Sequence, residues 1–217
     1  MGERPDPAAF VRANTAVAAP PLVPEIRLHL ASEITPLWHA TEATLAQSQL
    51  PPPYWAFAWA GGQALARYIL DHAELVRGCA VLDFGAGSGL VAIAAAHAGA
   101  HATAAEIDPF AAAAIKLNAE INAVEIAIER ADVIGREQIP WQAVLAGDMC
   151  YERPLAERLT LWLRGLARRG TLVLLGDPGR AYLPAGGLEK IACYDVPTTL
   201  DLEDRTSREG VVWRLLG

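Results

Sequence analysis

The sequence predicts an α/β fold, a doubly wound sheet of seven mostly parallel strands that ends in an antiparallel C-terminal strand pair. Three observations predict it. Short apolar strands alternate with helical segments from residue 80 to residue 176, as in parallel sheets covered by helices on both faces. Three closely spaced glycines separate the first of these strands from an apolar helix. Acidic residues follow several successive strands.

The chain is expected to divide into a lead-in segment over residues 1–50, packed on one domain over residues 51–217. In the lead-in, Ile26, Leu28 and Leu30 alternate with polar residues, which is typical of a half-buried strand. The elements expected there are a short helix at 6–14, a proline-punctuated linker at 18–24 and this strand at 26–30.

Helices and strands alternate through the domain. Helices are expected where apolar residues recur three and four positions apart, at residues 62–70, 90–98, 109–122 and 155–167. Strands are expected at short apolar runs between turn signals, at residues 80–84, 101–106, 126–128, 141–146, 171–176, 190–196 and 211–216. The run at 171–176 is almost entirely apolar, which indicates a strand buried on both faces.

The glycine loop distinguishes two classes of cofactor. Dinucleotide sites use the spacing G-x-G-x-x-G, whereas the glycines here are Gly85, Gly87 and Gly89. Asp83 precedes them, and a carboxylate there repels a pyrophosphate but suits a ligand with an ammonium and a sulfonium. Glu106 follows at about the separation expected for a ribose-binding acid. The loop therefore predicts S-adenosylmethionine rather than NAD, with plain packing at a strand-to-helix turn as the alternative.

The acids after the strands are expected to form one rim, because ligands of such sheets bind beyond the carboxyl ends of the strands. The acids are Asp83, Glu106 with Asp108, Asp132, Asp148 and Asp177. Each has a structural alternative: Asp132 and Asp148 are also suited to cap helices, and residues 177–179 to form a turn. Their recurrence after consecutive strands favours a functional rim.

Charge and cysteine content exclude some classes of protein. A net charge of −7 argues against nucleic-acid binding as the main activity, although Arg164, Arg168 and Arg169 are candidates for a local basic patch. The longest apolar run near the glycine loop, residues 90–96, is too short to span a membrane. The 3 cysteines form no C-x-x-C pair, so neither a disulfide framework nor a metal site is predicted. Without a recognisable signal peptide, a cytoplasmic location is expected.

Residues 59–180 resemble the seven-β-strand S-adenosylmethionine-dependent methyltransferases, whose sheet is Rossmann-like. Residues 81–89 (VLDFGAGSG) match their first motif and residues 106–109 (EIDP) their second. Residues 148–151 (DMCY) resemble the D-x-x-Y signature of a subgroup of protein lysine methyltransferases that includes calmodulin-type enzymes, and residues 55–65 resemble the tryptophan–glycine element of that subgroup.

The finer resemblance is to the bacterial lysine methyltransferases of the electron transfer flavoprotein β subunit, and it is carried by residues 147–151 together with residues 176–180 (GDPGR). It implies that this β subunit is the protein partner, with no metal, nucleic acid or membrane involved. The residues it implies for the cofactor are Trp59, Asp83, Gly85, Gly87, Gly89, Glu106 for the ribose and Asp132 near the adenine amine. Those it implies for the target lysine and its protein are Asp148, Tyr151, Asp177 and Arg180.

Three other functions stay open on the residues alone. One is a small-molecule methyltransferase of the nicotinamide type. Another is a ribosomal-protein methyltransferase, which usually carries an N-terminal substrate domain that this short lead-in does not provide. The last is a non-catalytic cofactor-binding module, disfavoured because Asp148 and Tyr151 are both present.

Overall fold

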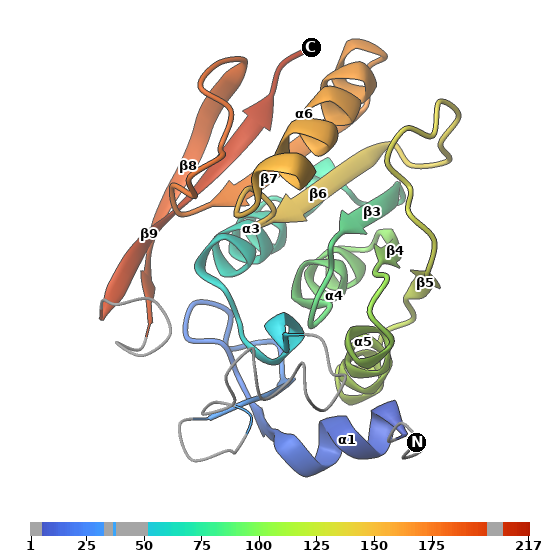
Figure 1. Ribbon diagram of the computed structural model, residues 1–217, viewed down its shortest axis with the longest axis vertical. Coiled ribbons are helices and arrows are strands. Elements are labelled where there is room, and N and C mark those ends of the chain that lie inside the picture. The colour runs from blue at the N-terminus through green and yellow to red at the C-terminus, as the bar shows by residue number, and fades with distance from the viewer. Residues whose placement is uncertain (1–5, 33–36, 38–51, 199–205) are drawn as a thin grey trace.

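The computed structural model describes residues 6–32, 37, 52–198 and 206–217, and one central sheet organises them (Figure 1). Its strands are β3 (Ala80–Phe84), β4 (His101–Ala105), β5 (Ala127–Glu129), β6 (Ala143–Gly147), β7 (Leu172–Asp177), β8 (Leu188–Pro197) and β9 (Ser207–Leu215). The 7-stranded sheet has the order β5-β4-β3-β6-β7-β9-β8. Its first five strands run parallel, and β9 pairs antiparallel with both β7 and β8. The predicted fold class is confirmed.

Helices cover both faces of the sheet, so each central strand is buried on both of its faces. The helices are α3 (Ala60–Asp71), α4 (Leu90–His97), α5 (Pro109–Ile121) and α6 (Arg153–Arg168). Val81, Leu145 and Leu174 point to the core beneath α3 and α4. The alternate residues of the same strands, such as Leu82 and Val173, point to the core beneath α6.

The predicted elements of the domain all form, and their ends differ where pairing extends past the apolar residues. The strand expected at 211–216 begins at Ser207, because the polar residues before Val211 still pair with β8, as Arg208 does with Val196. The strand expected at 171–176 extends to Asp177, which changes the position of that acid in the site.

The described part of the lead-in packs on α5. It consists of α1 (Pro7–Asn14), β1 (Ala16–Ala18) and β2 (Leu28–Leu30). The rings of Phe10 and Phe110 meet edge to face with centroids 5.0 Å apart, and the Asn118 side chain accepts the His29 amide N–H at 2.8 Å. The strand β1, which is exposed along its length, was not predicted because Ala-Val-Ala shows no alternation of apolar and polar residues. The boundary proposed at residue 50 lies outside the described residues and stays a prediction.

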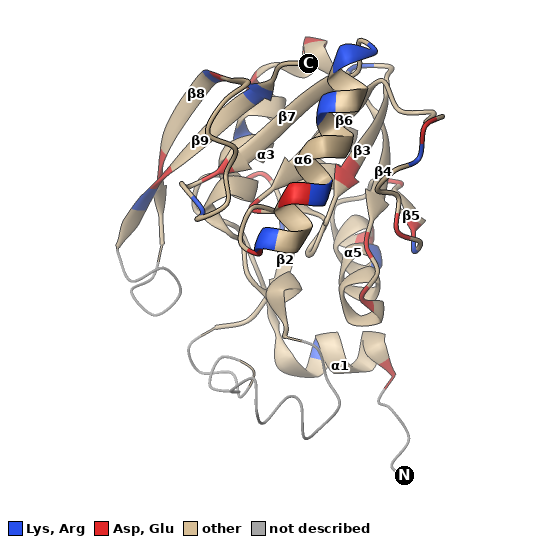
Figure 2. Cartoon of the chain, turned by 45° about the horizontal axis from the view of Figure 1, so that its top comes forward, with Lys and Arg blue, Asp and Glu red and all other residues tan. Residues whose placement is uncertain are grey.

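The arginines proposed as a basic patch lie at the C-terminal end of α6. Figure 2 shows basic residues along this helix, and the Arg164 guanidinium donates to the carbonyl oxygen of Gly186 at 2.7 Å. The cavity described below is lined by residues of the opposite end of α6, Leu155 and Arg158, so this patch is not part of it. Within the described ranges no helix is long and apolar enough to cross a membrane, and no cluster of potential ligands suits a metal ion.

Candidate active site

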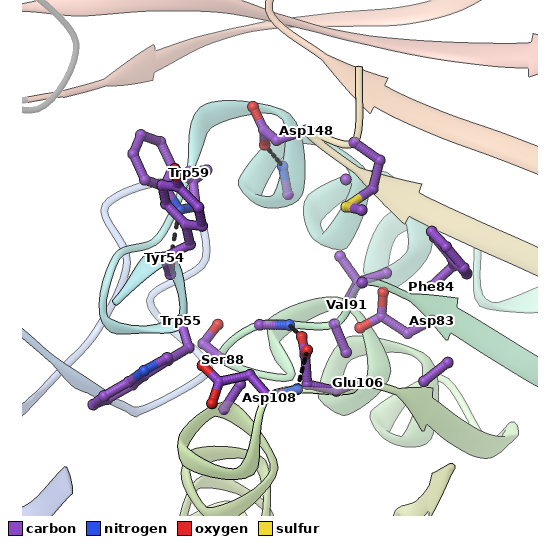
Figure 3. Close-up of a pocket in the computed structure, with 18 of the residues that line it drawn as sticks. Tyr54, Trp55, Trp59, Asp83, Phe84, Ser88, Val91, Glu106, Asp108 and Asp148 are labelled. Carbon is purple, nitrogen blue, oxygen red and sulfur yellow. Dashed lines mark hydrogen bonds between the residues drawn. The ribbon is translucent and has the colours of Figure 1, made fainter. Parts of the chain in front are cut away.

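A cavity of about 550 Å³ opens at the carboxyl ends of the central parallel strands, within the range of small-molecule sites. The glycine loop and the end of β4 form one side of it, and Asp148 with the residues before α3 forms the other (Figure 3). The cavity lies at the edge of the sheet where the sequence analysis expected a ligand. Of the predicted site residues, all but Gly89 and Asp177 line this cavity.

The glycine loop uses its three glycines in two ways. Gly85 and Gly87 have φ of 65° and 51°, the left-handed region that glycine adopts without strain. A Cβ on Gly85 would meet the flexible end of the Met149 side chain, so it is the positive φ that makes glycine the suitable residue there. Gly89 instead begins α4 with φ 81°, and a Cβ there would lie 3.2 Å from Cγ1 of Ile115. Its position is explained by packing, not by contact with the cavity.

Two acids lie at the floor of the glycine-loop side. Asp83 is 2% exposed, and its carboxylate accepts the Ala92 amide N–H at 2.9 Å. Burial, slightly opposed by that hydrogen bond, raises the pKa of Asp83 to about 8. The Glu106 carboxylate accepts the amide N–H groups of Gly87 and Asp108, each at 3.0 Å, and burial raises its pKa as well. Neither acid has a cationic side chain bonded to it among the described residues, so this end of the cavity fits a ligand that brings positive charge and hydroxyl groups.

Asp132 lies at the rim of the same side, in a different environment. Its Oδ1 accepts the Ile134 amide N–H at 2.9 Å, and its Oδ2 pairs with Arg158 at 3.0 Å. The hydrogen bond from the Ile134 amide has the larger effect and the pair with Arg158 adds to it, and both lower the pKa of Asp132. The sequence did not point to Arg158, which reaches Asp132 from α6 across 26 residues of chain and also lines the cavity.

Asp148 stands on the opposite side, directly after β6. Its backbone has φ 57°, a left-handed conformation to which aspartate is better suited than most residues. Its Oδ2 accepts the Gly62 amide N–H at 2.7 Å, and its Oδ1 pairs with Arg180 at 2.8 Å. Burial raises the pKa of Asp148 to about 6 in spite of Arg180 and Gly62. The structural alternative for Asp148 was a cap on α6; the helix whose N-terminus it contacts is α3.

Asp177 lies behind this pair and not on the cavity wall. As the last residue of β7 it is 1% exposed, and its Oδ1 accepts the amide N–H groups of Gly179 and Arg180 at 2.7 and 2.6 Å. Burial raises its pKa. Its Oδ2 is buried without a hydrogen-bond partner among the described residues. Asp177 therefore fixes the loop that presents Arg180.

Three aromatic residues, Tyr54, Trp59 and Tyr151, line the same cavity as Asp148. The Trp59 indole N–H donates to the Tyr54 carbonyl oxygen at 2.8 Å, and the ring centroids of Tyr54 and Tyr151 are 5.6 Å apart. Figure 3 shows Trp59 and Tyr54 on the Asp148 side, away from Glu106. The sequence analysis expected Trp59 beside the cofactor, and this stays a prediction: Trp59 and Trp55 both line the cavity, and the Trp55 Cα lies 3.6 Å from a Cβ placed on Gly87.

Gly61 of α3, Gly147 of β6 and Gly176 of β7 allow α3 to pack directly against the ends of these strands. This packing brings the Gly62 N–H to Asp148. A Cβ on Gly61 would collide with the backbone oxygen of Gly176 and would lie 2.7 Å from Oδ2 of Asp148. A Cβ on Gly147 would lie 2.8 Å from the Cα of Gly62. The position of the Asp148 carboxylate thus depends on close backbone contact between α3, β6 and β7.

We expect Gly61→Ala to destabilise the fold by about 1–3 kcal/mol, the usual cost of forcing extra atoms into a packed region. The midpoint of thermal unfolding should fall accordingly. Gly186→Ala is the matched control, because a Cβ at Gly186 meets nothing within 4 Å. If both variants melted like the wild type, the close contact between α3 and β7 would be wrong.

Known proteins show the same fold and sequence features. The family model of the ribosomal protein L11 methyltransferase (PrmA) matches residues 63–146. The chain is 39% identical over 214 residues to the electron transfer flavoprotein beta subunit lysine methyltransferase of Xenopus laevis, covering 95% of this chain and 86% of that protein. It is 37% identical to the Homo sapiens protein of the same name, covering 96% and 82%.

A solved structure of magnesium protoporphyrin IX methyltransferase from Synechocystis, with bound S-adenosylhomocysteine, superposes with a TM-score of 0.51. It is 17% identical and covers 70% of this chain and 80% of that one, which supports the fold. The identity to the lysine methyltransferases extends over nearly the whole chain. The chain therefore belongs to the electron transfer flavoprotein beta subunit lysine methyltransferase family, within the S-adenosylmethionine-dependent protein-lysine methyltransferases.

Proposed function

We propose that this protein-lysine methyltransferase acts on the electron transfer flavoprotein β subunit, which is named as the substrate of its relatives. The observation that supports it is one cavity with two chemically different ends. Buried acids and a glycine loop line one end, and Asp148 with its aromatic neighbours lines the other. A cofactor and a lysine side chain entering from opposite ends would meet inside it.

S-adenosylmethionine would occupy the glycine-loop end. When bound, it supplies a methyl group that passes to an amine nitrogen as its bond to sulfur breaks and leaves the electron pair on sulfur. Glu106 would accept hydrogen bonds from the ribose hydroxyls, while Asp83, Gly85 and Gly87 would face the methionine end. Asp132, held by Arg158, would lie near the adenine. Gly89 would act only by allowing α4 to start at the loop.

The target lysine would enter at the Asp148 end. An ordinary lysine has a pKa of about 10.4 and is mostly protonated at neutral pH, so the site must favour the neutral amine. Asp148 would orient that amine through a hydrogen bond. The exposed rings of Tyr54 and Tyr151, 47% and 43% accessible, would contact the lysine stem and attract the methylated ammonium by cation–π interaction of about 0.5–2 kcal/mol.

Methyl transfer to the purified β subunit tests the substrate. The protein should methylate lysine residues of that subunit, located by mass spectrometry of its peptides, and should leave nicotinamide unmodified. Rapid methylation of nicotinamide with none of the flavoprotein would contradict the proposal. The cytoplasmic location stays a prediction from the sequence.

Cofactor binding should strengthen as the pH rises from about 6 to about 8. Asp83 has its pKa raised to about 8 by burial, and a ligand with an ammonium and a sulfonium favours the carboxylate form. Binding then releases the Asp83 proton at low pH, and affinity grows by up to about tenfold for each pH unit until Asp83 is ionised in the free protein. Calorimetry with S-adenosylhomocysteine, whose ammonium is retained, measures this dependence.

Asp83→Asn is the matched variant for that titration, because it keeps an oxygen that can accept the Ala92 N–H. Its affinity for S-adenosylhomocysteine should vary less with pH than that of the wild type. An unchanged slope in the variant would show that Asp83 does not face the charged end of the ligand.

A further inference from the structure

Arg180 lies between the Asp148 carboxylate and the ring of Trp59. Its Nη2 and Nε donate to the same oxygen, Oδ1 of Asp148, at 2.8 and 3.2 Å. Its guanidinium carbon is 5.4 Å from the Trp59 ring centroid. The two side chains are 18% and 9% exposed, so the pair is held largely out of water, where the loss of either charge costs more than in a surface pair.

The backbone of Arg180 is fixed independently of its side chain. The Asp177 carboxylate accepts the amide N–H groups of Gly179 and Arg180 and so closes the turn after β7. That turn stands beside Asp148 because Gly147 pairs with Gly176 in the sheet. Asp148 and Arg180 therefore meet through the register of two adjacent strands, although 32 residues separate them.

The two oxygens of Asp148 differ in how many hydrogen bonds they already accept. An ionised carboxylate offers two lone pairs on each oxygen. Nε and Nη2 of Arg180 both donate to Oδ1, whereas the donor to Oδ2 among the described residues is the Gly62 N–H. Asp148 lines the cavity, and by this count of lone pairs Oδ2 is the oxygen with capacity for one more donor.

The charge on Arg180 has a direct consequence for an incoming lysine. A buried carboxylate without a partner would favour the protonated lysine, because an opposite charge nearby raises the pKa of an amine. A protonated amine has no lone pair with which to form a bond to carbon. A carboxylate already neutralised by a guanidinium retains its hydrogen-bond acceptor but attracts the ammonium less.

We propose that Arg180 is a positioning residue for methyl transfer: it neutralises and orients Asp148, so that the target lysine is bound as the neutral amine with one N–H donated to Oδ2. This inference rests on the lysine methyltransferase activity and on the β subunit as its substrate. It adds to them a means by which the site selects the reactive protonation state.

The other charged and titratable groups around the pair do not substitute for Arg180. Burial raises the pKa of the Cys150 thiol to about 12 and raises that of Tyr151, so both stay neutral near pH 7. The remaining groups that act on the pair or on its immediate neighbours are Asp177, Arg208 beside Asp177, Tyr54, Glu106 and Glu152. Arg180 is the cation that bonds Asp148 directly.

The first test needs neither cofactor nor substrate. In protein carrying ¹³C in its aspartate carboxyl groups, the Asp148 signal is identified by its loss in Asp148→Asn, and its titration is followed by NMR. The midpoint, near pH 6 in the wild type, should rise in Arg180→Gln by about one to three pH units, the usual effect of removing an adjacent opposite charge. An unchanged midpoint would overturn the proposal.

The second test is the pH dependence of kcat for methylation of the β subunit at saturating concentration, because kcat reports the ionisable groups of the bound complex, the target lysine included. In Arg180→Gln the rising limb should move to higher pH, so that activity falls at least about tenfold at pH 7 and recovers at alkaline pH. Arg180→Lys should restore part of the activity at pH 7. Arg153→Gln is the control, since Arg153 lies over the Tyr182 ring and should leave the profile unchanged.

An equal loss of kcat at every pH would mean that Arg180 only supports the structure, and would overturn the proposal. Wild-type protein that does not methylate the β subunit would contradict the proposed substrate instead. In that case the NMR titration still decides whether Arg180 controls the charge of Asp148.

Discussion

Replacing Asp148 by asparagine should reduce lysine methylation by about 10²–10³-fold, the usual effect of removing one preorganised electrostatic partner of a reacting group. Asparagine keeps an oxygen that can accept the Gly62 N–H but loses the charge that pairs with Arg180. Affinity for S-adenosylhomocysteine should stay within a few-fold of the wild type, because Asp148 lies on the opposite side of the cavity from Glu106 (Figure 3). Loss of turnover with retained cofactor binding is the signature of a contact made at the reacting centre.

The alanine variant adds a stability test. Asp148→Ala removes the acceptor for the Gly62 N–H in the first turn of α3, so we expect it to melt earlier, by the roughly 0.5–2 kcal/mol that a lost helix cap costs. Asp148→Asn should melt nearly as the wild type does. Folded Asp148→Ala protein that methylates at the normal rate would leave Asp148 with a structural role only.

Replacing Glu106 by alanine should weaken cofactor binding by roughly 1–3 kcal/mol, through loss of charge-assisted hydrogen bonds to the ribose. The Glu106 carboxylate also accepts the N–H groups of Gly87 and Asp108, so part of the effect will come from a loosened glycine loop. Calorimetry with S-adenosylhomocysteine measures the loss.

Two comparisons make that result specific. Glu106→Gln keeps a hydrogen-bond acceptor and should lose less affinity than Glu106→Ala. NADH should not bind the wild type at micromolar concentration, because the loop has the spacing G-x-G-x-G behind a buried acid. Tight NADH binding without binding of S-adenosylhomocysteine would contradict the assignment of the cavity.

The residues at the glycine-loop end of the cavity could be picked out from the sequence because they lie close together in the chain. The glycines, Asp83 and Glu106 lie within 24 consecutive residues, and the connection from β3 through α4 to β4 brings their ends together. Strand 171–176 was predicted to end one residue before the observed strand does, and this affects the position expected for Asp177. Because Asp177 belongs to β7, its side chain is buried behind the loop instead of facing the cavity, where the sequence analysis had expected it to meet the substrate.

The Asp148 end of the cavity was less predictable because its contacts join residues that are far apart in the chain. The pairing of Asp148 with Arg180 depends on the register of β6 and β7, and the Gly62 contact depends on α3 lying on glycines of both strands. Tyr54 belongs to no motif, and Met149 occupies a position of the D-x-x-Y signature at which the residue type is not specified. The direction of Trp59 follows from its hydrogen bond to Tyr54, which no spacing in the sequence indicates.

The central claim is tested most directly by labelled methyl transfer into a fractionated cell lysate, with wild-type protein and Asp148→Asn compared side by side. We expect the wild type to label the electron transfer flavoprotein β subunit, with the methyl groups on lysine nitrogens by mass spectrometry, and Asp148→Asn to leave it unlabelled. Label in another class of molecule, or equal labelling by both proteins, would contradict a lysine methyltransferase that works through Asp148.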